Sequence, residues 1–167
     1  MKRRADPKIE KIRAQEKAKA KIEKEGLYLP EKPREDEIPE VYDDLADLSD
    51  ADLMDELAIH TRWANYLNVQ VAVAEITESS AQMILSRVRN VARVKSSGGS
   101  VTESKARADL EDEVVEAEQE FGDSYAYRKM IGVLYENCER NAAMISRELT
   151  RRIGREGPER RDRRWNP

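Results

Sequence analysis

The chain has few of the residues from which disulfide bonds, metal sites and catalytic loops are usually built. Its 167 residues include one cysteine, one histidine, one phenylalanine and seven glycines. A single cysteine excludes an internal disulfide and fits a reducing compartment. The low glycine count and the lack of several β-branched runs argue against an α/β enzyme of this size.

Long apolar runs are also missing. No stretch approaches the roughly 18 to 20 consecutive apolar residues that span a bilayer, and the basic N-terminus lacks the apolar core of a signal peptide. We therefore expect a soluble, cytoplasmic protein with no membrane partner. Charge is abundant instead: charged residues make up 38% and aromatic residues 5%, a composition that suits long solvated helices.

The charges are unevenly distributed along the chain. Residues 1–25 carry a net charge of +5 and residues 147–167 a net charge of +4, which leaves −13 for residues 26–146. This distribution predicts four segments. They are a basic helical arm at 1–25, a proline-containing acidic linker at 26–48, a helical hairpin at 49–154 with its turn near 96–103, and an arginine-rich tail at 155–167.

Two stretches show the heptad spacing of a coiled-coil seam, in which steps of four and three residues alternate. Ser49, followed by Asp52, is a good N-cap for the first helix. The first seam consists of Leu53, Leu57, His60, Ala64, Leu67, Val71, Ala74, Glu78, Ala81, Leu85, Val88 and Ala92. The second lies in a helix expected from about residue 104 to Gly154, and consists of Val114, Ala117, Phe121, Ser124, Arg128, Ile131, Tyr135, Cys138, Ala142, Ile145 and Leu149.

Two helices of nearly equal length joined by a short Ser/Gly loop predict an all-α fold. We expect a long antiparallel, coiled-coil-like hairpin with a charged N-terminal helical arm and a basic C-terminal tail. Many large apolar residues lie off both seams, so we expect a homo-oligomer in which other copies supply more helices. These residues are Met54, Ile59, Trp63, Val69, Val73, Ile76, Met130, Val133, Leu134 and Met144.

Residues suited to catalysis or metal binding are scarce. His60 lies in the first seam one turn after Glu56, and no second histidine is present to complete a metal site. Cys138 occupies a seam position, where a thiol serves as a small buried apolar group. The loop "SSGGS" has no following Lys-Ser/Thr and so is no phosphate-binding loop. The sequence therefore predicts a protein that is not an enzyme and has no metal and no cofactor.

Clusters of basic residues are more informative, because they neutralise phosphates and release counterions. Arginine adds bidentate phosphate contacts and stacking on bases, and a tryptophan beside it can stack on an unpaired base. The predicted nucleic-acid-binding residues are Arg87, Arg89, Arg93, Lys95, Lys105 and Arg107 near the turn, and Arg147, Arg151, Arg152, Arg155, Arg160, Arg161, Arg163, Arg164 and Trp165 at the end of the chain.

The arginines at the end of the chain have a second interpretation. Residues 35–57 contain eleven acidic residues and no lysine or arginine. In an antiparallel hairpin the end of the second helix lies beside this acidic stretch, so the arginines could instead bind it, in the same chain or in a neighbour. Arg151 and Arg152 also lie near the C-terminal end of a helix, where positive charges interact favourably with the helix dipole. Both interpretations stay open at this point.

Trp63 and Tyr66 lie near the start of the first helix, and residues 127–153 read "YRKMIGVLYENCERNAAMISRELTRRI". With these features, residues 53–153 resemble the UvsY-type recombination mediators of tailed phages, and also small helical proteins of actinobacterial phages. The resemblance implies a ring-like oligomer that binds single-stranded DNA and loads a phage recombinase in the cytoplasm of the infected host. The alternative is a virion structural or scaffold-like assembly protein built from helical hairpins, with virion proteins as its partners.

Overall fold

The structure of the chain is a computed structural model. It describes residues 7–34, 38, 40, 44–96, 98 and 100–155, and the side chains of those from 15 to 154. Within this part of the chain there are four α-helices, one 3-10 turn and no strand. The predicted all-α class is therefore confirmed.

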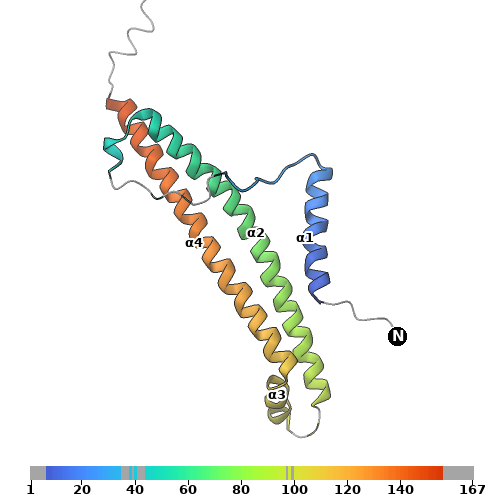
Figure 1. The fold of residues 1–167 in the computed structure, drawn as a ribbon. Helices are drawn as coiled ribbons and strands as arrows, with labels where there is room; N and C mark the ends of the chain where they lie inside the picture. The colour runs from blue at the N-terminus through green and yellow to red at the C-terminus, as the bar shows by residue number, and fades with distance from the viewer. Residues whose placement is uncertain are drawn as a thin grey trace, which may run out of the picture. The chain divides into compact units, whose positions relative to one another are not determined.

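The two longest helices pack against each other as the predicted hairpin (Figure 1). Among the described helices, none combines the length and the apolar character needed to cross a bilayer. In chain order the elements are α1 at Pro7–Lys24, the 3-10 turn η1 at Leu45–Asp47, α2 at Asp50–Lys95, α3 at Val101–Asp109 and α4 at Asp112–Arg155.

Tertiary contacts divide the chain into two compact units. Unit 1 contains Met1–Leu29 and Val69–Gly132, and unit 2 contains Pro30–Asn68 and Val133–Pro167. Each unit therefore holds one part of α2 and one part of α4. In unit 1 the core consists of Leu85, Ala92, Ala108 and Val114, with Val88, Ala117 and Phe121 packed against it. In unit 2 the most buried residues are Leu53, His60, Trp63, Leu67, Cys138 and Ile145.

The heptad spacing correctly predicted the inner faces of both long helices. Every seam position of α2 and of α4 is buried or half-buried. Several of these positions are alanines, such as Ala74 and Ala81, which let two helix axes approach closely. Ser49 is the predicted N-cap of α2: the backbone N–H of Asp52 donates to Ser49 Oγ at 3.2 Å, and Ser49 N–H donates back to the Asp52 carboxylate at 3.3 Å.

The sequence predicted one helix from about residue 104 to Gly154, but the structure divides this stretch into the short helix α3 and the long helix α4. α3 begins after Ser100, which forms a capping box with Glu103, and it ends at Asp109 with Leu110 as its C-cap. Ala108 and Val114 are both fully buried in the core of unit 1. On one unbroken helix these two residues would point about 120° apart, so the break allows both to face the same core.

Trp63 is another departure from expectation. The sequence places Trp63 off the seam, among apolar residues expected to be solvent-exposed in a single hairpin. Its side chain is nevertheless only 4% exposed. Its ring meets Tyr66 edge-on, with centroids 6.0 Å apart. Other off-seam apolar residues do remain exposed, including Met54, Met130 and Val133.

Candidate functional site

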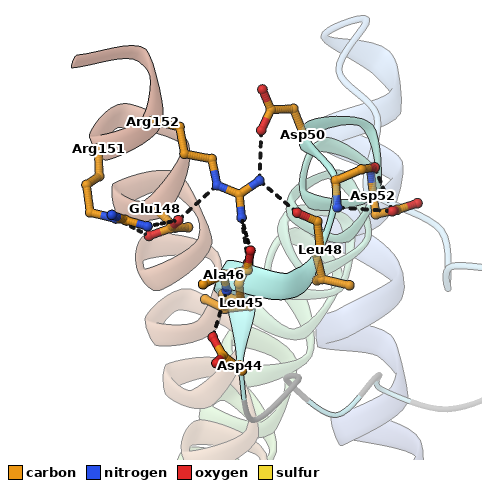
Figure 2. A network of polar contacts seen from close by, with 10 residues as sticks. Asp44, Leu45, Ala46, Leu48, Asp50, Asp52, Glu148, Arg151 and Arg152 are labelled. Carbon is orange, nitrogen blue, oxygen red and sulfur yellow. Dashed lines mark hydrogen bonds and ion pairs between the residues drawn. The ribbon is translucent and has the colours of Figure 1, made fainter. Parts of the chain in front are cut away.

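The open end of the hairpin, where α2 begins and α4 ends, carries the densest polar network among the described residues. Its floor is the turn η1, which Asp44 caps by accepting a hydrogen bond from the Ala46 N–H at 2.9 Å. The turn directs backbone carbonyl oxygens of residues 45, 46 and 48 toward the last turn of α4 (Figure 2). These oxygens form a ready acceptor site for a cation.

Arg152 on α4 fills this acceptor site. Its Nη1 donates to Leu48 O at 2.7 Å and to Asp50 Oδ1 at 2.8 Å, while Nη2 donates to Leu45 O at 2.8 Å and to Ala46 O at 3.0 Å. In Figure 2 the planar guanidinium lies between α4 and the segment of residues 45–50 that it binds. We call this network, Arg152 with residues 45–50 and Glu148, the arginine clasp.

Glu148 supports the clasp from its own helix. It accepts hydrogen bonds from Arg151 Nε at 2.6 Å and from Arg152 Nε at 2.9 Å. Hydrogen bonds from Arg151 and then from Arg152 lower the pKa of Glu148 to about 2. Glu148 hydrogen bonding raises the pKa of Arg151, while bonds to Asp50 and then to Glu148 raise the pKa of Arg152. This carboxylate therefore stays ionised and fixes the direction of the Arg152 side chain.

The clasp places one of the arginines predicted at the end of the chain beside the acidic stretch, as the second interpretation expects. Arg152 contacts the acidic stretch of its own chain, and Arg151 binds Glu148 on its own helix. Arg147 is exposed on α4, and the side chain of Arg155 lies outside the described residues. The other predicted residues of the tail, Arg160, Arg161, Arg163, Arg164 and Trp165, also lie outside the described residues.

The six basic residues near the turn form a second candidate cluster, in unit 1, which we call the tip cluster. Arg89 forms an ion pair with Glu118 and lies 4.0 Å from Asp109, measured from Nε to Oδ1. Lys95 Nζ lies 3.9 Å from a carboxylate oxygen of Glu111 and 4.0 Å from one of Glu113. The short helix α3 and the first turns of α4 thus supply acids to the basic end of α2.

The other four residues of the tip cluster lie at the protein surface. Arg107 donates to the Gly98 carbonyl at 3.5 Å, and Arg87, Arg93 and Lys105 have exposed side chains. Residues 87–118 contain six basic and seven acidic residues. The tip therefore has no net positive charge, although its predicted role in nucleic-acid binding stays a prediction.

His60 and its neighbours form a buried polar group in unit 2. His60 is fully buried, and its Nε2 lies 3.9 Å from Glu56 Oε2. Neither ring nitrogen of His60 nor Trp63 Nε1 has a hydrogen-bond partner among the described residues. Burial lowers the pKa of His60, and the Glu56 charge partly opposes this. The imidazole is therefore held in its neutral form.

Nothing in this arrangement resembles a metal or nucleophilic centre. Among the described residues, no group of three or more His, Cys, Asp and Glu is placed to hold a metal ion. Cys138 is buried, and burial raises the pKa of its thiol, which makes the thiol less reactive. The expectation that the chain is not an enzyme and needs no cofactor stays a prediction.

Sequence reasoning missed one polar pair. Glu78 and Arg128 were two charged interruptions in two separate seams, but in unit 1 they form an ion pair with each other. Arg128 also lies over the Tyr125 ring, 5.5 Å from its centroid. The available signal was that both residues are seam positions of opposite charge at matching heights of an antiparallel hairpin.

The fold and its contacts define an all-α helical hairpin protein whose open end is closed by an arginine clasp. Comparison of the chain with protein-family models, curated proteins and solved structures finds no match. The resemblance to UvsY-type mediators and to small phage helical proteins therefore stays a prediction.

Proposed function

We propose that this chain is a non-enzymatic assembly protein whose helical hairpins associate side by side into a homo-oligomer. The observation that supports this is the large apolar side chains left exposed outside the seams. In unit 1, Met83 is 65% and Met130 69% exposed, and in unit 2 Val133 is 55% exposed. Exposed apolar residues in this number usually mark contact surfaces between protein chains.

The test measures mass and then removes the apolar surface. Sedimentation at micromolar concentration should give a mass larger than one chain. Replacing Val133 and Met144 by glutamate should shift the population toward monomer, because charge at a contact core is strongly unfavourable. Gln119→Glu adds one glutamate without removing an apolar group and should leave the mass unchanged. A monomer at all concentrations would refute the proposal.

A contact with single-stranded nucleic acid is the second candidate function. The acids around the tip cluster favour assigning this contact to the tail, residues 156–167, because the tip has no net positive charge. Filter binding of single-stranded DNA tests it directly. If the protein binds, the recombination-mediator role with a recombinase partner gains support; detection of the protein in purified virions would instead favour the virion assembly role.

A further inference from the structure

An apolar groove runs along the open end of the hairpin in unit 2. It has a volume of about 550 Å³ and is lined by Met54, Leu57, Ala58, Thr61, Arg62, Leu149 and Ile153. Met54 is 63% and Ile153 76% exposed. A groove of this size and apolar character is typical of a site that receives a large apolar side chain.

The end of α4 lies at this groove. α4 ends at Arg155, two residues after the groove-lining Ile153. The groove follows α2 from Met54 to Arg62, a distance of about 12 Å along the helix. Trp165 lies ten positions after Arg155, enough for up to about 33 Å of extended chain. Gly157 and Pro158 are suited to the turn that would lead the tail back.

One acidic side chain beside the groove complements the tail in charge. Asp55, next to Met54 and one turn before Ala58 on α2, has an exposed side chain, whereas Arg62 in the lining is itself basic. The tail carries Arg160, Arg161, Arg163 and Arg164 immediately before Trp165. An indole at the Met54 end of the groove would bring these arginines toward Asp55, where an ion pair adds a modest, salt-sensitive contribution.

We propose that the groove is the docking site of Trp165 from the same chain, with a flanking arginine paired to Asp55 beside it. The tether favours this occupant over a second copy, because a short linker gives an effective concentration in the millimolar range. The arginine clasp holds α4 against residues 45–50 and so keeps the two walls of the groove in place. The proposal does not depend on self-association or on nucleic-acid binding.

Three methionines provide an internal comparison for the test. Met54, Met83 and Met130 are 63%, 65% and 69% exposed among the described residues, but only Met54 lines the groove. The full chain would be treated with hydrogen peroxide at submicromolar concentration and each methionine followed by mass spectrometry. If Trp165 occupies the groove, Met54 should oxidise several-fold more slowly than Met83 and Met130.

Variants separate docking from other causes of protection. Ending the chain after Arg155, or the substitution Trp165→Ala, should raise Met54 oxidation to the rate of the other two methionines, whereas Trp165→Phe should retain part of the protection. Equal oxidation of all three methionines in a full chain that sediments as a single copy would overturn the proposal. Protection that appears only as concentration rises would overturn it as well, since the occupant would then come from another copy. Sedimentation of the same samples reports self-association independently.

Discussion

Arg152 is the residue that joins the end of α4 to the chain before α2. It donates to three backbone carbonyls and to Asp50, and the carbonyls have no other described side-chain donor. A planar fork with several N–H groups is needed to reach all of them, and lysine has only a point-like ammonium group. The identity of this residue as arginine, and not merely as a cation, is therefore structural.

Replacing Arg152 should weaken the open end of the hairpin. We expect Arg152→Ala to lower the thermal unfolding temperature by a few degrees, because the half-buried carbonyl oxygens of Leu45 and Leu48 lose their partner. Arg152→Lys should be nearly as damaging. Arg151→Ala is the matched control, since both Arg151 bonds go to Glu148 on the same helix. Equal effects of the alanine variants in circular dichroism melting would contradict the role given to the clasp.

His60 should make stability depend on pH. Burial lowers the pKa of His60 from its usual value of 6.5, so the folded state favours the neutral ring. The unfolded chain then takes up a proton that the folded chain does not, and the free energy of unfolding falls as the pH drops from about 7 toward about 5. Since this is the only histidine, His60→Leu should flatten the dependence in urea titrations.

Glu148 supplies the control for this pH prediction, because it titrates in a different range. Its pKa is lowered from 4.5 to about 2, so its contribution is fully present above 4.5 and is lost as the pH falls toward 2. Glu148→Gln should leave the slope between about pH 7 and about pH 5 unchanged and reduce the loss of stability at lower pH. A slope that persists in His60→Leu would show that other groups cause it.

At the scale of elements, one pair of opposite charges lies in the seam between the two long helices. Glu78 and Arg128 are only 19% and 25% exposed. A charged pair in a seam contributes little net stability but penalises any register that separates the two charges. Their pairing therefore helps to define which turns of α2 and α4 face each other in unit 1.

A double-mutant cycle at this pair should show strong coupling. We expect Glu78→Leu or Arg128→Leu alone to cost about 1 to 3 kcal/mol, since each leaves an unpaired charge in the seam. The double variant should be about as stable as the wild type, because two leucines fill a seam well. Urea unfolding measures all four proteins. Additive losses in the double variant would show that the two side chains act independently.

At the scale of the whole molecule, charge is divided between a compensated hairpin and an arginine-rich tail. Arg151 and Arg152 at the open end, and Arg89 and Lys95 at the tip, have acidic partners. The tail, residues 156–167, adds four arginines and a tryptophan beyond them. Any nucleic-acid contact is therefore expected to depend on the tail more than on the hairpin.

Ending the chain after Arg155 should reduce binding to single-stranded DNA several-fold or more and leave helicity unchanged. If the tail contacts phosphates, the logarithm of affinity should fall with the logarithm of salt by roughly 0.7 for each phosphate neutralised, and truncation should flatten that slope. Arg93→Gln combined with Lys105→Gln removes two exposed tip charges as a control. If this control loses more affinity for single-stranded DNA than the truncated chain does, the nucleic-acid contact lies at the tip cluster.

The sequence by itself determined the helical class, the inner face of each long helix and the N-cap at Ser49. These depend on local periodicity and on contacts within one turn of helix, which are readable from spacing alone. Tertiary structure alone decided the break between α3 and α4, the pairing of Glu78 with Arg128, and the binding of Arg152 to the carbonyls of residues 45, 46 and 48. These features depend on which distant turns of the chain come together and on where the backbone oxygens point. The residue pattern of a single segment encodes neither the contacts between distant turns nor the directions of the oxygens.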